Sequence, residues 1–151
     1  MKGYHTYKDC IDACLKCAAI CNHCASSCTH EENIKMMAGC IQLDMECATI
    51  CYAAAQVMSL GGRSAKELCR ICAEICEACA AECGKHETKH CRECADACTQ
   101  CAEICRRMSS GEIFSSAESD LGRTPVDPQV MHADYGSSGA APVGAFDISK
   151  S

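Results

Sequence analysis

The residues most able to do chemistry in this sequence are its 19 cysteines among 151 residues. In the segment DCIDACLKCAAICNHCASSC they recur at steps of 4, 3, 4, 3 and 4, as Cys10, Cys14, Cys17, Cys21, Cys24 and Cys28. Steps that average 3.5 residues place side chains along one stripe of an α-helix that packs in a bundle. Such stripes usually carry Leu, Ile and Val, so the pattern predicts a helix whose buried face is made of thiols.

The same unit is repeated three more times. Two copies step by 3, 4, 3 and 4 residues, as Cys69, Cys72, Cys76, Cys79 and Cys83 and as Cys91, Cys94, Cys98, Cys101 and Cys105. A sparser copy holds Cys40, Cys47 and Cys51, with Met37, Ala54 and Met58 at other stripe positions. The repeat predicts an all-α fold, an antiparallel up-down-up-down four-helix bundle with a cysteine-lined core.

Local signals place the ends of the four helices. Capping-box spacing, Ser or Thr three residues before an acidic residue, occurs at Thr6, Thr29 and Ser64. Gly61-Gly62 follows the second helix, which we expect to be the longest, and the linker GKHETKH precedes the fourth. The predicted helices span residues 7–29, about 29–60, 64–84 and 91–108.

The composition changes at Ser109. Residues 109–151 contain no cysteine, all three Pro, five of the ten Gly and nine Ser, and show no helical or strand periodicity. Such a segment buries too little apolar surface to offset its ordering entropy. We therefore expect a four-helix domain over residues 1–108 and a low-complexity, flexible C-terminal tail over 109–151. The final GAFDISKS is a candidate docking peptide for a partner.

The rest of the composition limits the function classes. The start, MKGYHTYKDC, has no apolar stretch of a secretory signal, and no apolar run approaches the roughly 20 residues that span a membrane. We therefore expect a cytoplasmic protein that makes no membrane contact. In a reducing compartment, this many cysteines indicates metal binding in preference to disulfides. A net charge of −6 without a basic patch argues against nucleic acid as a partner.

A thiol stripe suits soft metal ions. Neighbours at i, i+3 and i+4 lie about 5–6 Å apart at Cβ, so two of them can hold one ion. Thiolates select Cu(I), Zn²⁺ or iron–sulfur clusters. Two bare thiolates 6 Å apart repel by roughly 3 kcal/mol at an effective dielectric of 20. The metal-free core must therefore be mostly protonated, and metal loading must release protons.

Charge balance favours copper among these metals. No Lys or Arg falls on the cysteine stripes, since Lys16, Arg70 and Arg92 occupy outward positions. Zn²⁺ bound by four thiolates leaves two uncompensated negative charges per site, which are costly to bury. One Cu(I) per thiolate leaves the interior neutral. The expected cargo is therefore multiple Cu(I) ions, about one per cysteine.

Four alternatives are weaker. The six C-x-x-C pairs suggest an iron–sulfur redox protein, but the ferredoxin spacing C-x-x-C-x-x-C-x-x-x-C-P is absent and the cysteines lie on helices. A zinc-thiolate buffer is less favoured because zinc knuckles place their cysteines on turns, whereas these segments are predicted to be continuous helix. Cysteine as mere core filler explains one or two residues, not all. Disulfides conflict with the compartment and with the odd count. No nucleophile–base pair or cofactor motif indicates an enzyme.

The cysteine pattern, together with the segment ECGKHETKHCRECADACTQC, closely resembles the bacterial cytosolic copper storage proteins over residues 4–108. Those proteins are four-helix bundles that fill with Cu(I), often as homotetramers. The resemblance implies that all 19 cysteines are Cu(I) ligands and that a few His, Met or Asp residues near one end assist. It also implies a homo-oligomer, specifically a tetramer.

In an up-down bundle the first and third connections share one end, which we call the mouth. It gathers Cys28, His30, Met36, Met37, Cys83, His86, His90 and Cys91. Imidazole and thioether groups are suited to passing Cu(I) inward, so we expect copper to enter here. His90 flanks the cysteine stripe directly and is the favoured accessory ligand. For His86 and His30 the alternative is an exposed turn residue, and for Met36 and Met37 it is core packing.

The sequence also makes predictions for His23, for Asp44, for the opposite end of the bundle and for the isoleucines. His23 is expected to face solvent. Asp44 either points inward, where it binds metal or a thiol, or is exposed by a small rotation that buries Leu43 instead. The opposite end of the bundle is predicted to hold Cys10, Met58, Cys69, Cys105 and Met108. The isoleucines that flank the stripes either seal the helix boundaries or form an oligomer interface: Ile11, Ile20, Ile41, Ile50, Ile71, Ile75 and Ile104.

Overall fold

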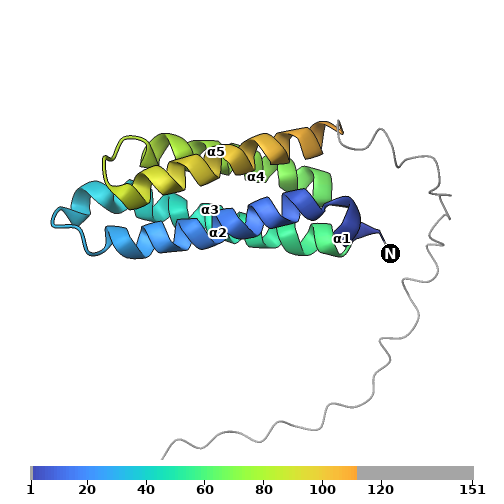
Figure 1. Cartoon of the computed structure of the whole chain (residues 1–151), viewed down its shortest axis with the longest axis horizontal. Helices are drawn as coiled ribbons and strands as arrows, with labels where there is room; N and C mark the ends of the chain where they lie inside the picture. The colour runs from blue at the N-terminus through green and yellow to red at the C-terminus, as the bar shows by residue number, and fades with distance from the viewer. Residues whose placement is uncertain (1, 112–151) are drawn as a thin grey trace, which may run out of the picture. The chain divides into compact units, whose positions relative to one another are not determined.

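The computed structural model describes residues 2–111 of the chain. Four long helices form an antiparallel bundle, and the described residues contain no β-strand (Figure 1). Most of the predicted tail 109–151 lies outside the described residues. The elements are α1 (Gly3–Thr6), α2 (Lys8–Cys28), the 3₁₀ helix η1 (Ile34–Met37), α3 (Ala38–Ser59), α4 (Ala65–Cys83) and α5 (Lys89–Ser110).

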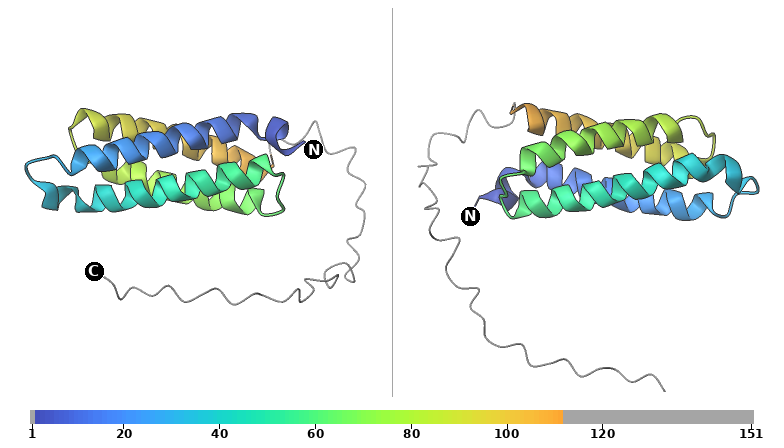
Figure 2. Two further views of the ribbon diagram at one scale, coloured as in Figure 1. Left: turned by 90° about the horizontal axis from the view of Figure 1, so that it is seen from below. Right: turned by 180° about the vertical axis from the view of Figure 1, so that it is seen from behind.

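The long helices follow one another around a ring. Each packs against two others, α2 against α3 and α5, and α4 against α3 and α5. The α2–α3 and α4–α5 turns meet at one end, and the α3–α4 turn lies with α1 at the other (Figure 2). The predicted up-down-up-down topology is confirmed, and the inward stripes of all four helices face one shared core.

That core consists of sulfur and small side chains. All 19 cysteines are buried, none more than 1% exposed, and alanines fill the positions beside them. Small alanine side chains allow the helices to approach closely enough for sulfurs on different helices to meet. Five isoleucines are half-buried against this core, and Ile11 is fully buried. The five are Ile20, Ile41, Ile50, Ile75 and Ile104, which cover the helix boundaries within one chain, and an oligomer interface on their exposed parts stays a prediction.

The predicted start of the second long helix is wrong. Thr29 does not cap a new helix, because its Oγ1 donates a 2.6 Å hydrogen bond back to the carbonyl of Ser26 at the end of α2. The chain then turns, forms η1 and enters α3 only at Ala38. α3 is not the longest helix either, since α3 and α5 have 22 residues each.

The other two capping boxes also fail to form. The residues that precede α2 and α4, Tyr7 and Ser64, make no side-chain cap hydrogen bond. Asp9 and Glu67 do lie in the first turns of these helices, where a negative charge opposes the positive end of the helix dipole. The capping pattern therefore located the starts of these helices through charge, not through reciprocal hydrogen bonds.

A short helix that the sequence did not predict, α1, packs against the turn after α3. A Cβ added to Gly3 would lie 2.4 Å from the backbone nitrogen of Gly61 and 2.7 Å from the carbonyl oxygen of Met58. Gly61 itself has φ of 65°, in the left-handed region that glycine tolerates best. Two glycines thus permit the close approach of α1 to the end of the bundle opposite the mouth.

Candidate metal centre

The interior of the bundle is a continuous column of free thiols. None of the 19 cysteines forms a disulfide. Neighbouring Sγ atoms contact one another at distances from 3.2 Å, between Cys40 and Cys83, to 4.0 Å, between Cys51 and Cys101. The contacts run both along each helix and between helices, so every sulfur lies within reach of an ion shared with its neighbours.

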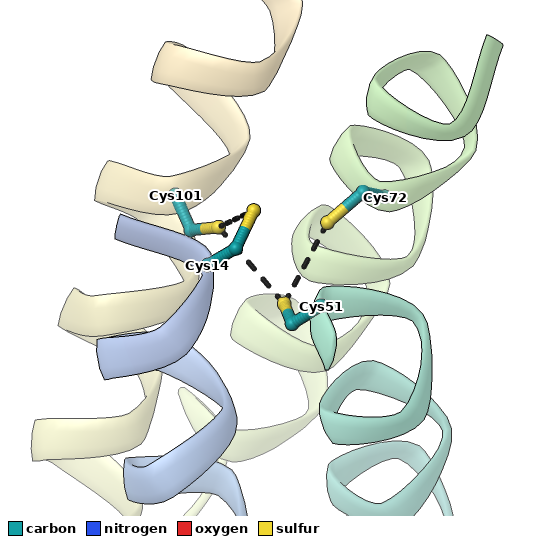
Figure 3. A group of neighbouring side chains, drawn as sticks. All are labelled: Cys14, Cys51, Cys72 and Cys101. Carbon is teal, nitrogen blue, oxygen red and sulfur yellow. Dashed lines mark hydrogen bonds between the residues drawn. The ribbon is translucent and has the colours of Figure 1, made fainter. Parts of the chain in front are cut away.

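Groups of four sulfurs repeat along the column. Figure 3 shows one group to which each long helix contributes one residue, Cys14, Cys51, Cys72 and Cys101. The Sγ of Cys51 lies 3.6 Å from that of Cys72 and 4.0 Å from that of Cys101, and Cys101 lies 3.8 Å from Cys14. All four Sγ atoms lie within 4.8 Å of one another. A soft ion can therefore take ligands from several helices at once.

Successive groups share members. Cys51 and Cys101 belong to a second group with Cys17 and Cys76, and Cys17 belongs to a third. Sharing means that the column is a series of overlapping sites rather than a set of separate ones. Further groups are Cys17, Cys21, Cys47 and Cys98; Cys21, Cys79, Cys94 and Cys98; and Cys24, Cys28, Cys40 and Cys91.

Asp44 is the only charged residue buried among residues 2–111. Its Oδ1 accepts hydrogen bonds from the thiols of Cys79, Cys83 and Cys94 at 3.2, 3.3 and 3.1 Å, and its Oδ2 accepts one from Cys40 at 3.6 Å. Loss of water raises the pKa of this carboxyl to about 10, with the nearby Cys94 as the next cause. Asp44 therefore keeps a proton at neutral pH while the thiols around it are unloaded.

The alternative orientation of α3 is excluded. Leu43 is half-buried and Asp44 is fully buried, so the helix presents its carboxyl to the core. Four thiols that can donate to the carboxyl compensate for its desolvation, whereas Leu43 retains part of its apolar contact at the helix boundary. The sequence pattern alone left these two positions equivalent.

The mouth contains one histidine that faces the sulfurs. The Nδ1 atom of His90 lies 3.4 Å from the Sγ of Cys91, 3.5 Å from that of Cys24 and 3.8 Å from that of Cys28. On the other side of the ring, Nε2 lies 2.8 Å from Oε1 of Glu31, in the turn after α2. His90 therefore lies where the prediction placed it, between solvent and the first thiols of the column.

The other predicted accessory residues differ in position. His86 is largely buried, and its Nε2 makes no hydrogen bond but lies 3.6 Å from Oε1 of Glu82. His30 is exposed, and its Nδ1 lies 2.9 Å from a backbone carbonyl at the end of α2. Met37 is buried in the core, whereas Met36 is 67% exposed. His86 and Met37 thus lie at the inner side of the mouth, and His30 and Met36 at its surface.

The end opposite the mouth carries a thioether. The thiol of Cys69 donates to Sδ of Met58 at 3.5 Å, and the Sγ atoms of Cys10 and Cys105 lie 3.6 Å apart. Met108 is buried beside them. The predicted composition of this end is confirmed, and His23 faces solvent as expected.

The electrostatics of the column favour protonated thiols before metal binds. Every Lys and Arg among residues 2–111 is exposed, so no buried cation stabilises a thiolate. Burial raises the pKa of the Cys28 and Cys91 thiols near the mouth. A cation that enters the column must therefore displace protons from the sulfurs that bind it.

A four-helix bundle whose core is an unbroken column of free thiols defines a class of proteins that bind several soft metal ions at once. Comparison with known proteins shows which family within this class the chain belongs to. The model of the copper storage protein family matches residues 4–110, and the chain belongs to that family.

Relatives of known structure share the sequence as well as the fold. Cu(I)-bound copper storage protein BsCsp3 is 48% identical, with 69% of this chain and 98% of that chain covered and a TM-score of 0.67. The apo form of copper storage protein 3 from Bacillus subtilis is also 48% identical, with 68% and 98% covered and a TM-score of 0.65. A cytosolic copper storage protein from Streptomyces lividans with five coppers is 35% identical, with 72% and 96% covered and a TM-score of 0.69.

A curated relative is also described as rich in cysteine. The cysteine-rich protein YhjQ of Bacillus subtilis is 50% identical over 81 residues, which are 54% of this chain and 75% of that protein.

Among the described residues, no helix has the length and apolar character to cross a membrane.

One residue of the mouth was not predicted from the sequence. Glu31 is hydrogen-bonded to His90 and lies 59 residues before it in the sequence. It lies in a turn beside a second acidic residue, Glu32. No spacing rule connects two such positions, because their contact depends on how the α2–α3 turn folds over the start of α5.

Proposed function

We propose that this protein stores and sequesters Cu(I) without catalysing a reaction, and that its 19 cysteines are the ligands. The observation that carries the proposal is the continuous column of buried free thiols, in which overlapping groups of four sulfurs lie within 4.8 Å. Family membership supports it, as do relatives with Cu(I), including the Streptomyces lividans protein loaded with 10 copper equivalents.

Charge explains why the cargo is monovalent copper. One Cu(I) per thiolate leaves the column neutral, which suits a core that contains no Lys or Arg. Zn²⁺ at four-sulfur sites would leave two negative charges at each, with no buried cation to offset them. Iron–sulfur clusters of the ferredoxin kind are held on loops, whereas all 19 cysteines here lie on helices. The expected capacity is about one Cu(I) per cysteine.

The mouth supplies the accessory ligands. His90 presents a ring nitrogen to three thiols, and His86 and Met37 lie on the inner side of the same end. Asp44 accepts hydrogen bonds from four thiols deeper in the column. As Cu(I) replaces the protons of those thiols, the donors to the carboxyl disappear, so Asp44 can release its own proton and become available as a metal ligand.

Three broader assignments belong to the same proposal. Residues 1–108 carry copper binding, and residues 109–151 form a separate low-complexity tail, whose final GAFDISKS is a candidate docking peptide. The protein works as a homo-oligomer, a tetramer by the family resemblance, with copper ions as its cargo. It acts in the cytoplasm, as the Streptomyces lividans relative described as cytosolic does.

An anaerobic titration tests the function directly. Reduced protein is titrated with Cu(I) in the presence of a chromogenic chelator that competes for the ion. We expect tight uptake that approaches one ion per cysteine and a protein without visible colour. Saturation at one to four ions would overturn the storage function. A brown protein after reconstitution with iron and sulfide, with Cu(I) bound only weakly, would favour the redox alternative instead.

A further inference from the structure

We infer that Glu31 is a positioning residue for copper uptake, and that it fixes the His90 ring with Nδ1 unprotonated and turned toward the thiols. This inference rests on the proposed storage function and goes beyond it, because it concerns how one ligand is oriented. Glu31 does not touch the thiols itself. It acts through the 2.8 Å contact between its Oε1 and Nε2 of His90.

The hydrogen-bonding capacities of the two groups decide which nitrogen of a neutral His90 ring carries the proton. A carboxylate accepts hydrogen bonds and donates none, whereas a neutral imidazole has one N–H donor and one acceptor nitrogen. Contact with Oε1 of Glu31 therefore places the proton of His90 on Nε2. The lone pair then belongs to Nδ1, which is the nitrogen that faces the sulfurs.

The inner side of the ring agrees with this assignment. Three thiols surround Nδ1, those of Cys91, Cys24 and Cys28, at 3.4, 3.5 and 3.8 Å. Protonated thiols are donors, so an unprotonated Nδ1 can accept a hydrogen bond from one of them, whereas an N–H would face them as a further donor. Cu(I) that displaces the thiol protons meets a nitrogen lone pair and sulfur ligands together. A carboxylate bonded to the far nitrogen of a metal-binding histidine fixes its tautomer and the orientation of its ring.

The location of the pair makes the orientation specific. Glu31 lies in the α2–α3 turn and His90 in the first turn of α5, so the contact joins two connections that the chain places at one end. The carboxylate side chain is 38% exposed and the imidazole 13%. The ring is thus held between an acceptor on the solvent side and donors on the core side, and a half-turn of the ring would put carbon atoms where the two nitrogens now lie.

Nuclear magnetic resonance of the side-chain nitrogens tests the orientation without copper. In reduced, metal-free, full-length protein we expect His90 to carry its proton on Nε2, with Nδ1 unprotonated. In Glu31→Ala the ring should lose this single tautomer and show a mixture. Glu32→Ala is the matched control, since it removes the same charge from the adjacent exposed position, and should leave His90 unchanged. A parent His90 protonated at Nδ1, or the same tautomer in Glu31→Ala, would overturn the inference.

Copper uptake tests the consequence. We expect Glu31→Ala to lower the initial rate of Cu(I) uptake from a chelator complex by about tenfold, the lower end of the range for lost partners of metal-binding histidines. Glu32→Ala should change it less than twofold. In a His90→Ala background, adding Glu31→Ala should change nothing further. A further tenfold loss in that background would show that Glu31 acts independently of His90 and would overturn its positioning role.

The two levels of the proposal fail in different ways. If the parent binds only a few Cu(I) ions while the His90 tautomer depends on Glu31, the storage function fails and the orientation stands. If the parent fills to about one ion per cysteine while Glu31→Ala takes up copper at the parent rate, storage stands and the positioning role is refuted.

Discussion

Substitution of one central cysteine tests whether charge balance sets the capacity of the column. Cys51 lies 3.6, 3.8 and 4.0 Å from the sulfurs of Cys72, Cys76 and Cys101, and it belongs to two groups of four sulfurs. Serine has nearly the same shape, but its hydroxyl is a poor ligand for a soft ion. We expect Cys51→Ser to bind one Cu(I) fewer than the parent protein.

The magnitude follows from the spacing of the sites. An ion in excess of the thiolates carries an uncompensated positive charge in a column whose sulfurs lie about 4 Å apart. Two such charges repel by about 4 kcal/mol at an effective dielectric of 20, so a second excess ion beside the first binds roughly thousandfold more weakly. Tight binding should therefore stop within about one ion of the number of thiolates, and each lost cysteine should remove one ion.

Cys10→Ser is the matched comparison. This cysteine lies near the end of the column, 3.6 Å from Cys105, and its loss should also remove one ion. Native mass spectrometry of the loaded proteins, combined with the chelator titration, counts the ions in each variant. A loss of four or more ions in Cys51→Ser, against one in Cys10→Ser, would show that intact four-sulfur groups govern capacity. Unchanged capacity in both variants would also refute the charge argument.

Three further outcomes are expected. Burial raises the pKa of Asp44 from an ordinary value of 3.8 to about 10, so between these values the folded state holds a proton that the unfolded state has lost, and the folded protein loses stability as pH rises. Asp44→Asn removes this titration, so the melting temperature of the reduced apo variant, relative to that of the parent, should increase from pH 5 to pH 9. A difference in melting temperature that stays constant over this range would contradict a protonated Asp44. Gly3→Ala should lower the melting temperature, because its Cβ would lie 2.4 Å from the Gly61 nitrogen. Gly39→Ala, inside α3 and facing only the flexible Glu82 side chain, should instead stabilise the fold by about 0.5–1 kcal/mol, and equal effects of the two substitutions would refute the role of α1 packing. A chain truncated after residue 111 should bind as many Cu(I) ions as the full chain in the same titration, since every cysteine precedes that position, and a lower count would assign copper binding to the tail.

The architecture was predictable because one residue type carries the whole pattern. The steps of 3 and 4 between cysteines define both the helix and the face that it buries, and the structure buries every one of them. A core of mixed apolar residues would blur the same periodicity. The end of α2 was also predicted to within one residue, Thr29 against an observed Cys28.

The failures concern one ambiguous local cap and two features that depend on contacts across the chain. Thr29 bonds back to α2, which local spacing cannot distinguish from a forward cap. Asp44 and Leu43 occupy neighbouring positions of a helix, and the choice between them is made by thiols from α4 and α5. Helix α1 depends on the backbone of Gly61, at the other end of a hairpin. For Asp44 and α1 the deciding partner is remote in sequence, whereas Thr29 bonds to Ser26, only three residues before it.

The position of α1 has a consequence for the order in which copper leaves. The thiols of the end that α1 covers, such as Cys10 and Cys69, are separated from the mouth by the length of the column. If copper enters and leaves at the mouth, as we propose, an ion held there can depart only after those nearer His90 have moved. The store then behaves as a stack, in which the last copper loaded is the first released and the deepest copper is a reserve that turns over slowly. An isotope pulse of copper added to a nearly full protein would therefore be released before the copper already present.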